Sequence, residues 1–123
     1  MTKKRQLIQE IFIRSATPLN AQQVFDETGG LLDRATVYRG LKYLEELRQI
    51  SSFIFDCDER GVERYYCGIG KEHQHFMHCQ RCHAFYPVKD CPLGKGLEII
   101  EKETGFKVKQ HFITLKGICR DCR

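Results

Sequence analysis

The sequence predicts an α+β fold in two parts, an N-terminal winged helix and a small α/β domain held by a structural zinc. Three segments with apolar residues at helical spacing come first, two short segments rich in β-forming residues follow, and cysteine and histidine concentrate in the rest. A chain of 123 residues buries one ordinary core or two small, marginal ones, so a bound metal or a partner chain is expected to stabilise it.

The first half is predicted to hold three helices. The first spans about residues 3–14, which carry apolar side chains at helical spacing, and Pro18 lies in the loop after it. The second begins after Asn20, which forms a capping-box pattern with Gln23, and ends at a glycine pair. The third begins after Asp33 as N-cap and runs to about Leu47.

The third predicted helix has two different faces. Its apolar stripe consists of Val37, Leu41, Leu44 and Leu47. The opposite face is formed by Ala35, Arg39 and Lys42 and is flanked by Thr36 and Tyr38. Two cations, a hydroxyl and an aromatic ring suit one groove of DNA, and an ordinary solvated helix face is the alternative. Gly40 lies inside this helix, where glycine costs about 1 kcal/mol relative to alanine.

Residues 50–55 and 62–67 predict a β-hairpin, because β-forming residues flank a turn-like stretch from Asp58 to Gly61. Three helices followed by a hairpin are typical of a winged helix, which places its third helix in the major groove. We expect a DNA-binding domain over residues 1–67, a hinge over 68–74 and a second domain over 75–123. In the second domain we expect strands at 75–79, 83–88 and 106–115 and a helix at 93–104.

Two Cys-x-x-Cys pairs predict a structural zinc site. Cys79, Cys82, Cys119 and Cys122 supply the four thiolates of a closed tetrahedral site. A redox Cys-x-x-Cys is normally one pair at a helix start, so redox chemistry is the weaker interpretation. The odd total of seven cysteines also argues against a disulfide framework.

A second, regulatory metal site is predicted near the hinge. His73 and His75 share one face of an extended segment, and Cys67 ends the hairpin just before them. Asp56 is the predicted fourth ligand, in preference to Asp58 and Cys57. A thiolate with imidazoles and one carboxylate favours Zn²⁺ over Fe²⁺ or Mn²⁺. We interpret Cys57, Cys91, His78 and His83 as structural, because none has a partner at a recognisable ligand spacing.

Charge and hydropathy set limits on the function. The net charge is +4, but residues 1–66 carry equal numbers of basic and acidic side chains, so bulk charge does not locate a DNA-binding face. No apolar run approaches the roughly 20 residues of a membrane span, and no signal-peptide core follows the N-terminus. We therefore expect a soluble, cytoplasmic protein with no membrane partner.

Taken together, these motifs resemble the ferric uptake regulator superfamily along essentially the entire chain. The resemblance rests on Arg34-Ala-Thr-Val-Tyr-Arg39, on His73-Gln-His75 before Cys79-Gln-Arg-Cys82, and on His111 eight residues before the last Cys-x-x-Cys. The position of Cys67 makes the chain look most like the zinc uptake regulator branch. One residue more than usual separates His75 from Cys79, which leaves the ligand register open.

The resemblance implies a zinc-sensing transcriptional repressor that binds a palindromic operator in double-stranded DNA as a homodimer. The residues expected to contact DNA are Arg5, Arg34, Thr36, Tyr38, Arg39 and Lys42. His111 matches a ligand of a further, more variable site, to which we add Glu98 as a candidate. The alternative within the family is an iron- or peroxide-responsive regulator.

Two other classes of function compete with a regulator. A zinc hydrolase would use an incomplete Cys/His site that keeps a water for catalysis, but we identify no general base and no pocket in the sequence. A zinc-stapled module whose winged helix binds protein is the other rival, and the balanced charge of residues 1–66 permits it. We therefore expect no enzymatic activity.

Overall fold

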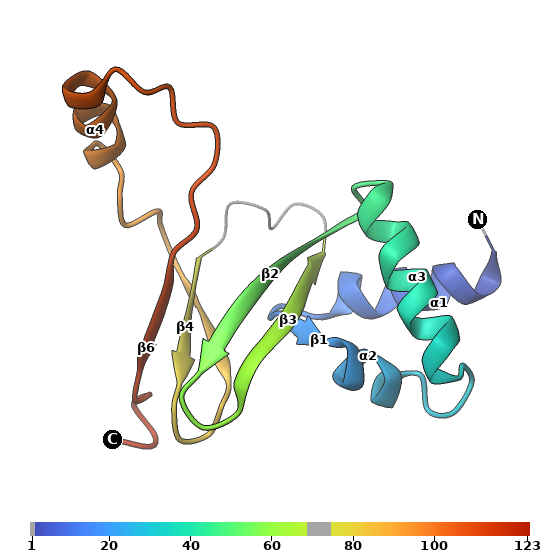
Figure 1. Ribbon diagram of the computed structural model, residues 1–123. Coiled ribbons are helices and arrows are strands. Elements are labelled where there is room, and N and C mark those ends of the chain that lie inside the picture. The colour runs from blue at the N-terminus through green and yellow to red at the C-terminus, as the bar shows by residue number, and fades with distance from the viewer. Residues whose placement is uncertain (1, 69–74) are drawn as a thin grey trace. The chain divides into compact units, whose positions relative to one another are not determined.

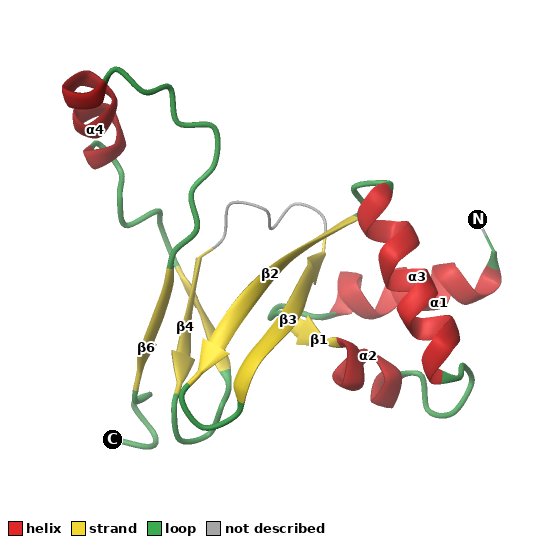
Figure 2. Ribbon diagram, in the orientation of Figure 1, coloured by secondary structure: helices red, strands yellow, loops and turns green. Residues whose placement is uncertain are grey.

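The computed structural model describes residues 2–68 and 75–123. The chain separates into two compact units, Met1–Glu72 and His73–Arg123, each of which mixes helices and strands (Figures 1 and 2). The predicted α+β class is confirmed. Among the described residues, no helix has both the length and the apolar character needed to cross a membrane.

The N-terminal unit contains three helices and a three-stranded antiparallel sheet. Its elements are α1 (Lys3–Arg14), β1 (Leu19–Asn20), α2 (Ala21–Glu27), α3 (Arg34–Glu46), β2 (Ile50–Cys57) and β3 (Gly61–Gly68). The sheet order is β1-β3-β2, and β2 and β3 form the predicted hairpin. The three predicted helices and the wing are confirmed, so the unit is a winged helix.

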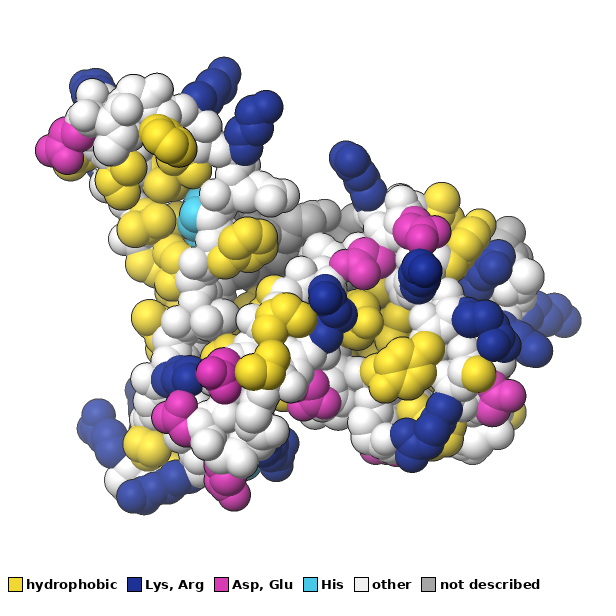
Figure 3. Space-filling view, in the orientation of Figure 1, with side chains coloured by type: hydrophobic (Ala, Val, Ile, Leu, Met, Phe, Trp, Pro, Cys, Tyr) yellow, Lys and Arg dark blue, Asp and Glu magenta, His cyan; other side chains and the backbone are white. Residues whose placement is uncertain are grey.

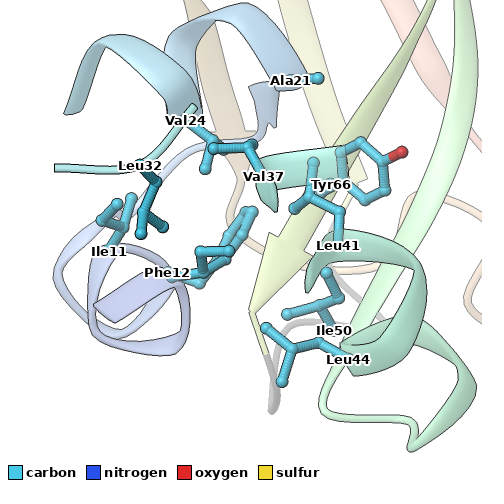
Figure 4. Close-up of a cluster of buried hydrophobic side chains, with 11 residues drawn as sticks. Ile11, Phe12, Ala21, Val24, Leu32, Val37, Leu41, Leu44, Ile50 and Tyr66 are labelled. Atoms are coloured by element: carbon cyan, nitrogen blue, oxygen red, sulfur yellow. The ribbon is translucent and has the colours of Figure 1, made fainter. Parts of the chain in front are cut away.

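The core of this unit lies between the three helices and the sheet. Figure 4 shows side chains of α1, α2 and α3 converging with Ile50 of β2 and Tyr66 of β3. The apolar stripe predicted for α3 is buried at Val37, Leu41 and Leu44, whereas its fourth predicted member, Leu47, is the C-cap and is exposed. This stripe faces the core, and the opposite face of α3 is therefore left to solvent.

Side-chain caps fix where the helices begin. Asn20 and Gln23 form the predicted capping box at the start of α2, with hydrogen bonds of 2.7 and 2.8 Å between each side chain and the other residue's backbone N–H. The Asp33 carboxylate accepts a 2.8 Å hydrogen bond from the backbone N–H of Thr36 at the start of α3. Hydrogen bonding by Thr36 lowers the pKa of Asp33. The caps thus set the starting point of the helix that carries the exposed cations.

Gly40 permits the close approach of α1 and α3. It is buried in the middle of α3, and a Cβ atom there would overlap the terminal methyl group of Ile8. Ile8 is itself completely buried, so it has little room to move aside. The propensity cost of a glycine inside a helix is therefore offset by tight packing between two helices of the core.

The C-terminal unit is a three-stranded mixed sheet with one helix. Its elements are β4 (His75–Cys79), β5 (Phe85–Val88), α4 (Gly96–Thr104) and β6 (Thr114–Gly117). The strand order is β5-β4-β6, with β4 antiparallel to β5 and parallel to β6. Central β4 is thus the strand to which the other two are attached.

The prediction of a strand over residues 106–115 is wrong for most of its length. Only Thr114–Gly117 forms a strand, paired with the last four residues of β4. A strand needs a neighbour for its backbone hydrogen bonds, and β4 has just five residues to offer. Residues 105–113 instead form an irregular connection from α4 to β6. The helix also begins at Gly96, later than the expected residue 93.

Apolar side chains are exposed along much of the C-terminal unit. Helix α4 has no buried residue, and hydrophobic side chains gather along α4, the segment after it and β6 (Figure 3). The exposed members are Ile99, Ile100, Phe106, Phe112, Leu115 and Ile118. A patch of this kind is typical of a surface that another chain covers.

The contact between Gly40 and Ile8 yields a test of helix packing. Gly40→Ala should lower the free energy of unfolding by roughly 1 kcal/mol, because overpacking costs about 1–3 kcal/mol and the gain in helix propensity returns only about 1 kcal/mol. Ile8→Val removes the methyl group that the new Cβ would meet. In the double variant the alanine should therefore become neutral or stabilising. Chemical denaturation of the four proteins measures this coupling, and purely additive effects would contradict it.

Candidate metal centres

Four cysteines converge at one end of the C-terminal sheet. Cys79 is the last residue of β4 and Cys82 lies in the turn that follows, whereas Cys119 and Cys122 follow β6. The parallel register pairs Cys79 with Gly117, so the closing Cys-x-x-Cys begins beside the first one. Residues far apart in sequence are thereby brought to one place by the pairing of β4 with β6.

The spacing of the sulfurs fits a tetrahedral zinc. All four Sγ atoms lie within 4.8 Å of one another, and those of Cys82 and Cys119 are 3.8 Å apart. Zinc–sulfur bonds of about 2.3 Å place two thiolates of a tetrahedron about 3.8 Å apart. The donor set and the spacing therefore agree with the predicted structural site.

Hydrogen bonds favour the thiolate form at two of these cysteines, Cys79 and Cys119. The Sγ atom of Cys79 accepts hydrogen bonds of 3.4 Å from the backbone N–H groups of Cys119, Cys82 and Arg81. These bonds, with Cys119 the largest contributor, lower the pKa of Cys79 to about 5. A hydrogen bond with Tyr86 lowers the pKa of Cys119. Interaction with the Cys119 thiol raises the pKa of Cys122 to about 12, so a metal must displace a proton there.

A second group lies inside the same unit. His75 begins β4, Cys91 lies between β5 and α4, and His111 lies in the connection from α4 to β6. The Nε2 atom of His111 is 3.1 Å from Nε2 of His75 and 3.3 Å from Sγ of Cys91. Residues from three segments therefore place two imidazoles and a thiol around one point.

The dimensions of this group also suit a metal ion. Around a tetrahedral zinc, two imidazole nitrogens lie about 3.3 Å apart and a nitrogen and a sulfur about 3.6 Å apart. The separations at His111 are shorter than these values by about 0.2–0.3 Å. His75 is buried and the other two side chains are half-buried, which shields a bound ion from bulk water.

Comparison with known proteins identifies the family. The model of the ferric uptake regulator family matches residues 1–116. The ferric uptake regulation protein of Bacillus subtilis is 34% identical over 110 residues, which cover 85% of this chain and 71% of that protein. The chain belongs to the ferric uptake regulator family.

Solved structures of the family share the fold. The ferric uptake regulator of Helicobacter pylori, described as having three functional metal-binding sites, superposes with a TM-score of 0.82 at 22% identity, over 99% of this chain and 81% of that one. A zinc-bound manganese uptake regulator gives a TM-score of 0.73 at 22% identity, over 97% and 89%. Members of this family are metal-responsive transcription regulators that bind DNA, not enzymes.

The exposed face of α3 carries most of the side chains for which the sequence predicts DNA contacts. Tyr38 is 57% exposed, and Arg39 and Lys42 are exposed beside it. The Arg39 guanidinium donates a 3.3 Å hydrogen bond to the hydroxyl of half-buried Thr36. The face therefore presents the cations and the ring that the sequence predicts there.

Two further predicted DNA contacts pack on aromatic rings. The Arg34 guanidinium lies 4.5 Å from the centre of the Phe25 ring and also donates a hydrogen bond to Gln22. The Arg5 guanidinium lies 3.6 Å from the centre of the Tyr43 ring. Cation–π contacts of this kind orient the side chains, and a guanidinium keeps free donor directions for phosphate.

The predicted partnership of Asp56 with Cys67 needs correction. In the hairpin Cys67 pairs with Ser51 near the open end, whereas Asp56 pairs with Val62 beside the turn. Five residue positions along β3 separate the two sites, which is about 16 Å at roughly 3.3 Å per residue. Asp56 and Cys67 lie near opposite ends of the hairpin, so they cannot hold one ion within it.

Three other predicted ligands, His73, Cys67 and Glu98, are not among the described residues grouped with His75 and His111. His73 lies outside the described residues, and Cys67 belongs to the N-terminal unit. Glu98 is exposed in the first turn of α4 and is not part of the group formed by His75 and His111. The sequence interpretation missed Cys91, because it is twenty positions before His111 with a helix between them, and no local spacing links the two.

Removal of a sulfur from the four-cysteine site should unfold the C-terminal unit. We expect Cys119→Ser to lose one zinc per chain and to lose hydrogen-exchange protection in β4, β5 and β6, because structural zinc and folding are coupled. Cys91→Ser is the matched control: it removes one thiol from the second group of the same unit, leaves the four-cysteine site complete, and should keep hydrogen-exchange protection in the three strands even if the second group loses its own ion. Native mass spectrometry and hydrogen exchange measure both effects. Full zinc and full protection in Cys119→Ser would refute the assignment.

Proposed function

We propose that this protein is a zinc-responsive repressor that binds a palindromic operator as a homodimer in the cytoplasm. The observation that carries the choice of metal is the thiol in the group of His75, Cys91 and His111. A thiolate with imidazoles suits a borderline ion of low coordination number, whereas Fe²⁺ and Mn²⁺ favour nitrogen and oxygen ligands in larger number. We therefore assign zinc as the signal.

We assign His73 as the fourth ligand of this regulatory site. The described residues supply three donors, and a tetrahedral zinc takes four. His73 is two residues before His75, and the sequence predicts an extended segment there, in which side chains two residues apart share one side. The earlier expectation that Cys67 provides the thiolate stays a prediction, and Cys91 is the alternative favoured by its distance from His111.

The homodimer is proposed because helix α4 is short and leaves its apolar side chains exposed. A helix of nine residues is too short to be stable alone, and the apolar side chains of α4 are exposed. A second copy that covers α4 and β6 would bury this surface and give the protein two α3 helices. Two such helices match the two half-sites of a palindromic operator.

Zinc would act by shifting the population toward the state that binds DNA. Its ligands come from the start of β4, from the β5–α4 connection and from the α4–β6 connection. Of these, His75 directly follows in sequence the residues that join the two units. A metal bound to it restrains the point at which that segment enters the C-terminal unit, and a ligand shifts an equilibrium only by such differential interactions.

The first test is fluorescence anisotropy with operator-type DNA, on protein that retains its structural zinc. Buffered free zinc should induce tight binding, while Fe²⁺ and Mn²⁺ in reducing, anaerobic buffer should not. Cys91→Ser should shift the zinc response to at least tenfold higher free zinc. Loss of a residue that only hydrogen-bonds to a metal ligand weakens metal binding by about 10–100-fold, and loss of a direct ligand should weaken it more. Cys67→Ser is the matched control and should respond as the wild type does.

The opposite pattern of responses would change the assignment. A response lost in Cys67→Ser and kept in Cys91→Ser would return the sensing thiolate to the hairpin. Activation by Fe²⁺ or Mn²⁺ alone would make the protein an iron- or manganese-responsive regulator, in keeping with the name of its Bacillus subtilis relative. If no metal induces DNA binding, the repressor proposal is wrong, and only the fold with its proposed structural zinc remains.

The exposed face of α3 should provide the DNA contacts. We expect Arg39→Ala to weaken operator binding by about 5- to 150-fold, which corresponds to roughly 1–3 kcal/mol for a base-contacting arginine. Lys102→Ala, which removes an exposed cation from α4, is the control and should change binding little. Anisotropy at several salt concentrations measures both, because each lost phosphate contact also reduces the salt dependence. Equal effects of the two substitutions would contradict the placement of DNA on α3.

A further inference from the structure

The four cysteines of the structural site have unequal surroundings. Cys79 is 2% exposed, and its sulfur accepts three backbone hydrogen bonds. Cys82 is exposed, and its sulfur lies 3.9 Å from the hydroxyl oxygen of Tyr86. The Cys82 edge is therefore the part of the cluster that faces solvent.

Tyr86 is held in place by the sheet. It lies in β5, where its backbone pairs with Met77 of β4, and it is four positions after Cys82 in the sequence. Its ring borders a cavity of about 540 Å³ that Cys79, Cys119 and Leu115 also line. Besides Cys82, the hydroxyl interacts with the Cys119 thiol. One phenol thus contacts a sulfur from each Cys-x-x-Cys pair.

A zinc-bound thiolate keeps lone pairs that accept hydrogen bonds, and a phenol is a suitable donor. Groups that hydrogen-bond to metal ligands in this way orient the ligands and reduce their tendency to dissociate from the metal. We infer that Tyr86 is a positioning residue of the zinc site, whose hydroxyl donates to the Cys82 and Cys119 thiolates and restrains the solvent-facing edge of the cluster. This inference rests on the proposed zinc at the four cysteines.

The position of Tyr86 assigns it a protective role. Loss of zinc begins when one sulfur leaves the ion, and Cys82 is the exposed residue of the four, so its sulfur is expected to be the first to meet electrophiles. When iodoacetamide attacks, a carbon–sulfur bond forms at Cys82, the carbon–iodine bond breaks and iodide leaves, after which the thioether binds zinc poorly. Hydrogen bonding by Tyr86 lowers the nucleophilicity of that sulfur and slows the opening of the site.

The experiment compares the full-length wild type with Tyr86→Phe, which keeps the ring and removes the hydroxyl. We expect zinc transfer to a chromogenic chelator to become about 10–100-fold faster. This factor is the loss of metal affinity that follows when a group that hydrogen-bonds to a metal ligand is removed. In protein loaded with cobalt, the thiolate-to-cobalt charge-transfer band should shift. Peptide mapping after brief iodoacetamide treatment should find Cys82 labelled before Cys79, and labelled sooner in the variant.

Tyr43→Phe is the matched control, because it makes the same change in the N-terminal unit and keeps the ring beneath Arg5. It should release zinc at the wild-type rate. Tyr86→Phe with unchanged release, band and labelling order would overturn the inference while leaving the zinc site itself in place. A wild-type protein that holds no zinc at these cysteines would instead remove the proposed structural site. Circular dichroism of each variant separates both outcomes from simple misfolding.

Discussion

The parallel pairing of β4 with β6 is the interaction on which the C-terminal unit depends. It places the end of the chain beside the turn after β4, so that four sulfurs meet at tetrahedral spacing. The strands themselves are short, and α4 buries nothing within its own unit. A small unit of this kind cannot rely on a large apolar core, and a metal bound by the four cysteines would link its two ends and supply the missing stabilisation.

The same pairing creates the conditions for a second site at the other end of β4. His75 begins that strand, and the two connections that flank α4 carry Cys91 and His111 to it. A structural ion at the four cysteines would support the second group at the other end of β4, where His75 is buried and Cys91 and His111 are half-buried. This division suits a regulator, because one metal must stay bound while the other responds to its concentration.

The N-terminal unit is organised by different forces. An Asp33 cap sets the start of α3, its apolar stripe faces the core, and Gly40 brings it against α1 at Ile8. These local constraints leave the opposite face of the helix exposed, with Tyr38, Arg39 and Lys42 directed to solvent. The exposed face of α3, which we propose binds DNA, is thus a consequence of how the helix packs.

The sequence by itself determined the features that depend on neighbours along the chain: the three helices with their caps, the hairpin, and the two Cys-x-x-Cys pairs as a zinc site. Periodicity and ligand spacing are local properties, so they can be read before folding. Only the tertiary structure decided that β6 is short, that Asp56 lies far from Cys67, and that Cys91 meets His111. Strand register and the paths of connections set those distances, and they depend on partners that the local sequence does not contain.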